Sequence, residues 1–216
     1  MAEKLRTDIL TGANNVFVLF EDLKNGDEKM VFLLNINHFS NINDIYGFPV
    51  GDEVLKSIKL LLDRLIHKDS KLYRLDSDQF VIVSDNLDIK YASFFANTLL
   101  SFFNETTISA SDLELKLTFS IGIDHGCTNE VINNAKVALL DSRKSGRNNF
   151  KFFDKNSEVL KQQERMSMWM HKIQDAIHED ELVPYFQPIV NNTTGEVEKY
   201  ECLARIIKDD EVHIPF

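Results

Sequence analysis

The stretch LYRLDSDQFVIV, residues 72–83, determines how the rest of the chain is interpreted. Two apolar runs flank the polar centre Asp76-Ser77-Asp78-Gln79, and this pattern predicts two antiparallel strands joined by a tight turn. The acids at the centre belong either to an exposed, solvated turn or to an active site. The segments on both sides of the hairpin bear on this choice.

The predicted elements around the hairpin alternate between strands and helices. They are a buried strand at 30–37, helices at 38–46 and 51–67, a helix at 88–104, a strand at 113–123, a helix at 129–143 ended by Gly146, and a strand at 149–153. We expect Asp52 and Glu53 in the first turn of the second helix, where acidic side chains are favoured. This order predicts an α/β sandwich with a central mixed or antiparallel sheet flanked by helices.

The pattern changes after Asp154. Asn156 or Ser157 is predicted to cap a helix that runs to about residue 180, followed by strands at 184–190 and 197–206. The helix has fewer than three clear heptads, so we expect a linker that packs on a neighbouring domain rather than a coiled coil. The predicted division is a first domain at 1–154, a linker helix at 155–180 and the start of a second domain at 181–216.

Composition disfavours some classes of partner. Lysine and arginine total 24 against 34 acidic residues, and the net charge of −10 disfavours non-specific binding to nucleic acid or anionic membranes. Cys127 and Cys202 are isolated, which favours free thiols in a reducing cytosol, and the six histidines are interpreted as surface or packing residues. We see no signal peptide and no window of about 18 apolar residues. The expected location is the cytoplasm, either alone or as the cytoplasmic part of a longer, membrane-anchored protein.

Five segments occur in a characteristic order: DILTGANN (8–15), NINHFSNINDIYGFPVGDEVL (35–55), RLDSDQF (74–80), FSIGI (119–123) and AKVALLDSRKSGRN (135–148). Together they resemble the GGDEF domain of diguanylate cyclases, and RLDSDQF falls where that family has R-x-G-G-D-E-F. The resemblance implies a nucleotidyl-cyclase-like sandwich that joins two GTP molecules, held by two domains face to face. It therefore implies GTP, Mg²⁺ and a second copy of the domain as partners.

The sequence departs from this family at the residues that carry the chemistry. In the family, carboxylates at the end of the first strand and at the hairpin tip hold Mg²⁺, and two glycines let the backbone approach the nucleotide. Here Asn35 replaces the strand aspartate, Asp76 and Ser77 replace both glycines, Asp78 keeps the acid and Gln79 replaces the glutamate. An alternative is that Asp76 and Asp78 together hold a metal from new positions.

The residues that bind the nucleotide in the family are better kept. Asn43 and Asp52 match its guanine-contacting pair, Arg147 matches a phosphate-contacting arginine, and Arg143 stands at a lysine position. The alternative is structural: Asn43 ends its helix, Asp52 caps the next, and the arginines favour a helix C-terminus. The family's inhibitory product site reads His67-Lys68-Asp69-Ser70 here, so we expect no cyclic-di-GMP binding there.

The C-terminal segment resembles a second family. YFQPIV followed by GEVEKYECLAR is similar to the start of an EAL domain, a cyclic-di-GMP phosphodiesterase of TIM-barrel type. Glu201 matches that family's metal-binding glutamate and Arg205 the arginine that follows it. A TIM barrel needs about 250 residues, so this truncated start cannot close a barrel by itself.

Three functions therefore compete. The first is a catalytically degenerate GGDEF domain that regulates an attached EAL domain and binds GTP weakly or not at all. The second is a weakly active diguanylate cyclase that uses Asp76 and Asp78. The third is an interaction or dimerisation module that binds no nucleotide.

Overall fold

The computed structural model describes residues 6–24, 26–208 and 211–214. The chain divides into two compact units, Met1–Val159 and Leu160–Phe216. Cys127 in the first unit and Cys202 in the second are both free and exposed. Within the described ranges, no helix is both long and apolar enough to cross a membrane.

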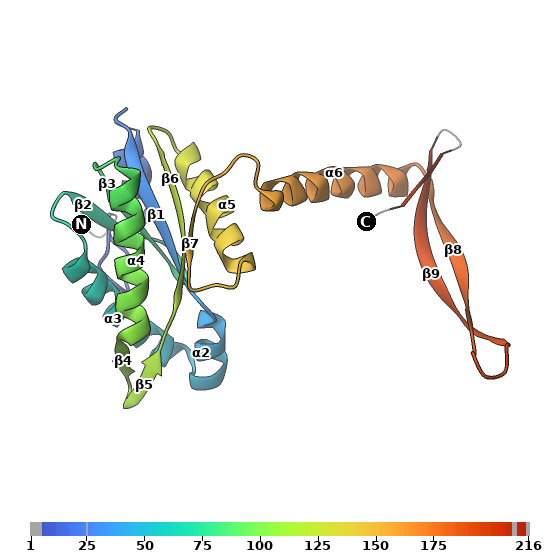
Figure 1. Ribbon diagram of the computed structural model, residues 1–216, viewed down its shortest axis with the longest axis horizontal. Helices are drawn as coiled ribbons and strands as arrows, with labels where there is room; N and C mark the ends of the chain where they lie inside the picture. The colour runs from blue at the N-terminus through green and yellow to red at the C-terminus, as the bar shows by residue number, and fades with distance from the viewer. Residues whose placement is uncertain (1–5, 25, 209–210, 215–216) are drawn as a thin grey trace. The chain divides into compact units, whose positions relative to one another are not determined.

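A five-stranded mixed sheet forms the centre of the first unit (Figure 1). Its strands, in spatial order, are β2 (Ser70–Asp76), β3 (Gln79–Ser84), β1 (Lys29–Ile36), β6 (Phe119–Gly126) and β7 (Phe150–Phe152). All neighbours are antiparallel except β6 and β7, which are parallel. The predicted mixed sheet and the predicted hairpin at 72–83 are confirmed.

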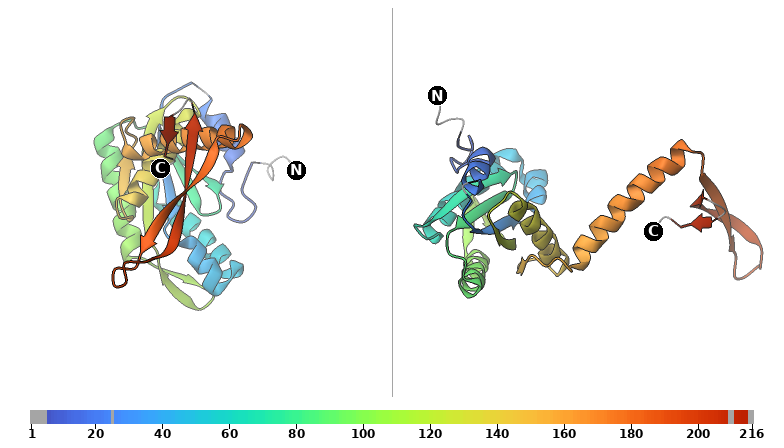
Figure 2. Two further views of the ribbon diagram at one scale, coloured as in Figure 1. Left: turned by 90° about the vertical axis from the view of Figure 1, so that its right-hand side faces the viewer. Right: turned by 90° about the horizontal axis from the view of Figure 1, so that it is seen from above.

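Helices cover both faces of this sheet (Figure 2). They are α1 (Val16–Leu23), α2 (Phe39–Tyr46), α3 (Phe48–Leu65), α4 (Ile89–Glu105) and α5 (Glu130–Lys144). Successive side chains of β1 point to opposite faces, so Phe32 and Leu34 pack in one core while Val31 and Leu33 pack in the other. The first core includes residues of α2, α3 and α4, and the second includes residues of α1 and α5.

Helix α5 lies very close to β6, and a glycine makes this possible. A Cβ added at Gly122 would clash with the backbone oxygen of Ala135 and the backbone nitrogen of Leu139. Because both atoms are main chain, the helix itself would have to move. Gly122 therefore fixes how closely α5 approaches the sheet.

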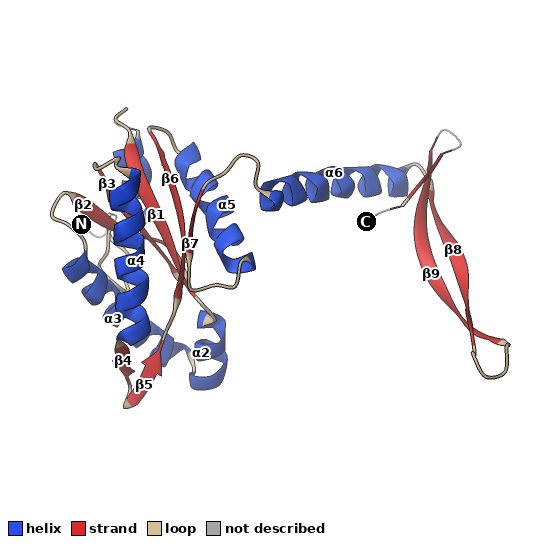
Figure 3. Cartoon of the chain, viewed as in Figure 1, coloured by secondary structure: helices blue, strands red, loops and turns tan. Residues whose placement is uncertain are grey.

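The structure differs from the predicted elements in three places. The strand predicted at 113–123 is two strands: β5 (Leu113–Lys116) pairs with β4 (Thr107–Ala110) in a separate hairpin, and β6 starts only at Phe119 (Figure 3). Helix α1 was not predicted, although Asn15 caps it by accepting hydrogen bonds from the Phe17 and Val18 amides.

The third difference concerns the start of α3. The helix begins at Phe48, with Pro49 in its first turn, so no acidic residue lies in that turn. Asp52 therefore neither caps α3 nor lies in its first turn. Glu53 has another role, because its carboxylate accepts a hydrogen bond of 2.6 Å from the Ser111 amide in the β4–β5 turn.

The second unit consists mainly of α6 (Glu158–His178) and a sheet of β8 (Leu182–Val190), β9 (Val197–Lys208) and β10 (Glu211–His213). The predicted cap is confirmed, because Ser157 Oγ accepts a hydrogen bond of 3.1 Å from the Val159 amide. Strands β8 and β9 form a long antiparallel hairpin around the predicted turn at 191–195.

Candidate functional site

A cleft of about 350 Å³ opens where β1, the β2–β3 turn and the end of α5 meet. Its volume lies within the range of sites that hold small ligands. His38, expected only as a surface or packing residue, is exposed and lines this cleft. The described residues that line it are Asn35, Ile36, His38, Phe39, Ser40, Asn43, Ser77, Asp78, Arg143 and Arg147.

Two arginines from one end of α5, Arg143 and Arg147, form what we call the arginine wall of the cleft. Arg143 lies in the last turn of the helix, and Arg147 lies in the loop that follows it. Gly146, Arg147 and Asn148 all have positive φ angles, of 110°, 59° and 47°. This conformation is uncommon for residues with a side chain, so the surrounding structure must hold the loop in place.

Asn149 and Ser142 hold the loop that carries Arg147. The Asn149 side-chain amide donates to the carbonyl oxygens of Arg147 at 2.9 Å and of Ser142 at 3.1 Å. Ser142 is fully buried, and its hydroxyl donates to the Asn149 carbonyl at 2.8 Å. The sequence pattern does not reveal these two positioning residues, although Asn149 directly follows the segment 135–148.

Asn35, Ser77 and Asp78 also line the cleft, and we call this group the strand wall. Asn35 is 3% exposed, and its side-chain amide donates to Asp78 Oδ2 at 2.6 Å. The other oxygen of Asp78 accepts from the Ser77 hydroxyl at 3.1 Å. Both oxygens of this carboxylate therefore accept from neutral donors. Asp78 is half-buried, in contrast to the expected solvated turn.

Asp76 and Gln79 do not line the cleft, within the part of the chain that the structure describes. Asp76 is exposed, and its carboxylate accepts a hydrogen bond of 2.7 Å from the Ser77 amide. Gln79 is the first residue of β3 and lies opposite Asn35 in the ladder. We therefore place the charge of Asp76 at the turn and not among the cleft-lining groups.

Arg74 supports the hairpin tip from outside the cleft. One guanidinium nitrogen donates to Asp8 at 2.8 Å, and another donates to the carbonyl of Ser77 at 2.8 Å. Burial alone would raise the pKa of Asp8, but hydrogen bonds from Thr11 and Arg74, together with the Arg74 charge, hold this pKa below its usual range. The N-terminal segment thus braces the strand wall.

Of the two residues expected to contact a base, Asn43 lines the cleft and Asp52 does not, among the described residues. Asn43 Oδ1 is buried without a hydrogen-bond partner and lies against Gly51, where an added Cβ would clash with it. Asp52 is half-buried on α3. Gly51 therefore provides the space that the Asn43 amide occupies.

The residues of the strand wall do not fit Mg²⁺. This ion takes oxygen ligands in a nearly ideal octahedron, usually with one or two carboxylates. Asn35 turns its nitrogen toward Asp78, and an amide nitrogen is not a ligand for a hard cation. Within the described ranges, no three His, Cys, Asp or Glu side chains form a group that could hold a metal ion.

A comparison with protein families agrees with this architecture. The model of the diguanylate cyclase GGDEF domain matches residues 6–149, and the model of the EAL domain matches residues 170–215. The chain belongs to the GGDEF family. This GGDEF domain is followed by an EAL segment, the arrangement of cyclic-di-GMP signalling proteins.

Relatives and solved structures agree with the assignment. The cyclic di-GMP phosphodiesterase NbdA of Pseudomonas aeruginosa is 29% identical over 95% of this chain, which spans 28% of that protein. The oxygen sensor protein DosP of Escherichia coli is 27% identical over 98% of this chain, which spans 27% of that protein. The solved GGDEF domain of TpbB (YfiN) from Pseudomonas aeruginosa aligns with a TM-score of 0.67 at 20% identity, over 72% of this chain and 99% of that one.

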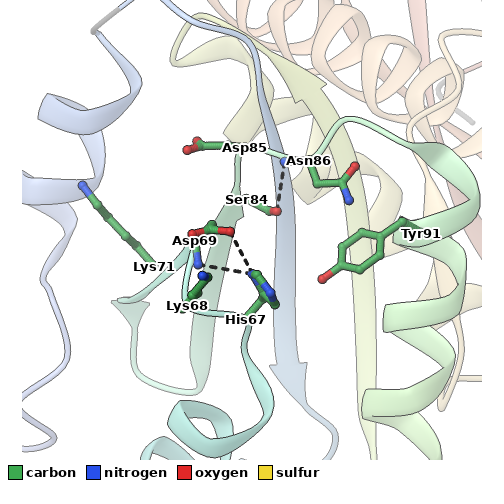
Figure 4. Close-up of a pocket in the computed structure, with 8 residues that line it drawn as sticks. All are labelled: His67, Lys68, Asp69, Lys71, Ser84, Asp85, Asn86 and Tyr91. Atoms are coloured by element: carbon green, nitrogen blue, oxygen red, sulfur yellow. Dashed lines mark hydrogen bonds and ion pairs between the residues drawn. The ribbon is translucent and has the colours of Figure 1, made fainter.

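The family's product-site register lies at the opposite end of the hairpin strands from the cleft. His67, Lys68 and Asp69 line a cavity of about 550 Å³ together with residues that include Tyr91 of α4 (Figure 4). Its polar side chains contact close neighbours: His67 Nδ1 lies 3.1 Å from Asp69 Oδ2, and the Lys71 ammonium lies 3.0 Å from the Asp22 carboxylate. That this GGDEF domain does not bind cyclic-di-GMP there remains a prediction.

The EAL segment presents its matched residues on β9. Glu201 is exposed and lies opposite Gln187 of β8 in the ladder. The Arg205 guanidinium lies over the Tyr185 ring, 6.0 Å from its centroid. The expectation that Glu201 binds a metal applies to a complete EAL domain and remains a prediction.

Proposed function

We propose that this GGDEF domain binds GTP without converting it and regulates an EAL phosphodiesterase domain in a cyclic-di-GMP signalling protein. The observation that carries the proposal is the contrast within the cleft. The arginine wall and Asn43 supply groups for phosphate and base, while the strand wall holds Asp78 in hydrogen bonds to neutral donors. Arginine pairs with phosphate through a fork of donors.

The size of the catalytic loss supports a regulatory role. A metal ion contributes several kcal/mol to the stabilisation of the charge that develops during phosphoryl transfer. Losing about 4 kcal/mol slows a reaction about a thousandfold. Asn35 and the Asp76-Ser77 turn remove a ligand and both glycines, whereas GTP binding requires only that phosphate and base contacts remain.

A short route leads from the cleft to helix α6. Arg143 lines the cleft, and Asp141, two residues earlier on α5, accepts a hydrogen bond of 3.2 Å from Ser157 Oγ. Ser157 is 7% exposed, caps α6 and is followed by the buried Val159. A shift of α5 on nucleotide binding would therefore reach the first turn of the helix that leads to the EAL segment.

Calorimetric titration with GTP and with ATP tests nucleotide binding. We expect a dissociation constant for GTP of about 100 µM or tighter, with ATP at least about tenfold weaker. No binding at millimolar GTP would rule out the nucleotide-binding function and favour a pure interaction module. Chromatography of a GTP incubation tests the enzyme alternative, and cyclic-di-GMP formation that is lost in Asp78→Ala would establish a cyclase.

The regulatory part is tested on the whole protein with a complete EAL domain. We expect GTP to change its rate of cyclic-di-GMP hydrolysis severalfold, and Ser157→Ala to abolish the change while GTP still binds. Ser145→Ala is the control, because it also removes a serine hydroxyl beside a helix end, but Ser145 follows α5 and is exposed. A response unchanged in Ser157→Ala would rule out this route.

A further inference from the structure

A hydrogen bond joins the side chains of Asn35 and Asp78, which are 43 residues apart in the chain. Asn35 is near the end of β1, and Asp78 is the second residue of the β2–β3 turn. A second contact joins the same places, since the Ile36 amide donates to the Asp78 carbonyl at 3.2 Å. The turn is thus attached to the central strand through both the side chain and the backbone of Asp78.

The orientation of the Asn35 amide follows from charge. An amide has a donor end and an acceptor end, and a carboxylate accepts hydrogen bonds but repels another oxygen. Asn35 therefore presents its nitrogen to Asp78, at 2.6 Å. The Asn35 N–H group therefore points at the Asp78 carboxylate. In the family, the residue at this strand position is a carboxylate that shares a cation with the turn.

We propose that the Asn35 amide replaces the divalent cation in this cleft, so that the GGDEF domain binds its nucleotide in a cation-independent way. This inference rests on the proposed function only for the identity of the ligand. The arginine wall alone then balances the phosphate charge, and Mg²⁺ bound to the nucleotide competes with Arg143 and Arg147. The preferred ligand is consequently the metal-free nucleoside triphosphate.

The first experiment uses the unmodified chain. GTP is titrated once with millimolar Mg²⁺ and once with EDTA. In a separate titration, Mn²⁺ is added without nucleotide, and the electron paramagnetic resonance signal of free aqueous Mn²⁺ measures how much remains unbound. We expect GTP affinity in EDTA to equal or exceed that in Mg²⁺, and Mn²⁺ alone not to bind at micromolar concentrations. GTP binding that requires Mg²⁺, or micromolar binding of Mn²⁺ alone, would overturn the proposal.

The second experiment changes the amide to a carboxylate. Asn35→Asp puts two carboxylates at hydrogen-bond distance, and like charges so close are stabilised by a shared cation or a shared proton. We expect this variant to bind Mn²⁺ at least about tenfold more tightly than the unmodified chain, and its melting temperature to rise when Mn²⁺ is added.

Asn37→Asp is the matched control on the same strand. Asn37 is also buried, at 6% exposure, but its side chain donates to Thr118 Oγ1 and accepts from Ser120 Oγ, both neutral groups. We expect no gain in Mn²⁺ affinity from this change. An equal gain in both variants would mean that any added acid suffices, which contradicts a specific exchange at Asn35.

The two proposals fail in different ways. If GTP binds neither with Mg²⁺ nor in EDTA, the nucleotide-binding function is lost, but the Mn²⁺ titrations still decide whether the Asn35 amide replaces a cation. If GTP binds and Asn35→Asp gains no Mn²⁺ affinity, the proposed nucleotide binding stands, but the proposal that the Asn35 amide replaces a cation is wrong. Should Asn35→Asp not fold, the titrations of the unmodified chain decide.

Discussion

The two walls of the cleft differ in what they can do for a nucleotide. The arginine wall presents two cations from α5 and its following loop, whereas the strand wall presents an amide, a hydroxyl and a carboxylate joined by hydrogen bonds. The first is suited to attract phosphates and the second is closed to Mg²⁺. In the proposed function, the arginine wall therefore serves nucleotide binding, while the strand wall lacks the ligands that a cation-dependent reaction needs.

The largest expected change in stability comes from a substitution that displaces α5, and with it the arginine wall. Gly122→Ala brings a Cβ against the backbone of α5 and must shift the helix that carries the arginine wall. We expect a loss of about 3 kcal/mol in the free energy of unfolding, measured with urea. Gly126→Ala is the control, because its Cβ would meet Val131 at an ordinary 3.7 Å. Equal effects would contradict the close packing at Gly122.

The next effect removes the arginine wall and leaves the strand wall intact. Replacing Arg143 and Arg147 together by alanine should weaken GTP binding by about 2 kcal/mol, roughly thirtyfold, because charged hydrogen bonds to phosphate are lost. Calorimetry measures the change. Lys136→Ala removes the same charge from the exposed side of α5 and should leave the affinity unchanged. A matching loss in Lys136→Ala would point to general electrostatic attraction instead.

A smaller effect concerns Asn43, to which the proposed function assigns base recognition. Gly51→Ala adds a Cβ that displaces the Asn43 amide, the far end of a flexible side chain. The free energy of unfolding should fall less than in Gly122→Ala, because the added Cβ meets side chains only, Asn43 and the Phe39 ring at 3.2 Å. The preference for GTP over ATP should fall by about 1.4 kcal/mol, or tenfold. Asn43→Ala should give the same loss of preference. A retained preference in both variants would exclude Asn43 from base recognition.

The smallest effect tests the brace behind the strand wall. The pKa of Asp8 is lower in the folded chain, so its contribution is complete above about pH 4 and is lost as the pH falls through the folded-state pKa. In Asp8→Asn, the free energy of unfolding should therefore fall by about 1 kcal/mol less between neutral and acidic pH than in the unmodified chain. Asp44→Asn, an exposed change on α2, should keep the limb of the unmodified chain. Identical profiles for the Asp8 variant and the unmodified chain would contradict the brace.

Much of the fold follows from local patterns in the sequence. The strand at β1, the hairpin, helices α2 to α5 and the cap at Ser157 are visible as apolar periodicity or as capping residues. The pattern fails where elements are short or adjoin one another. Alternation continues from β5 into β6, so two strands in different sheets look like one.

The site could be predicted only in part. Sequence matching brings together Asn43, Arg143 and Arg147, which line one cleft in the structure. It cannot show that the Asn35 amide reaches Asp78, because such a contact depends on the register between β1 and the turn. It also places Asp52 wrongly in a first turn, since Gly47, with φ at 84°, lets a new helix begin directly after α2.

The two cysteines provide a built-in means of observation. Each compact unit contains one thiol, and both thiols are exposed, so a pair of spin labels or fluorophores can be attached without introducing any new residue. The distance distribution between the labels then reports directly on the separation of the GGDEF domain from the EAL segment. Recorded with and without GTP, this distance distribution measures whether the nucleotide changes the separation of the two units.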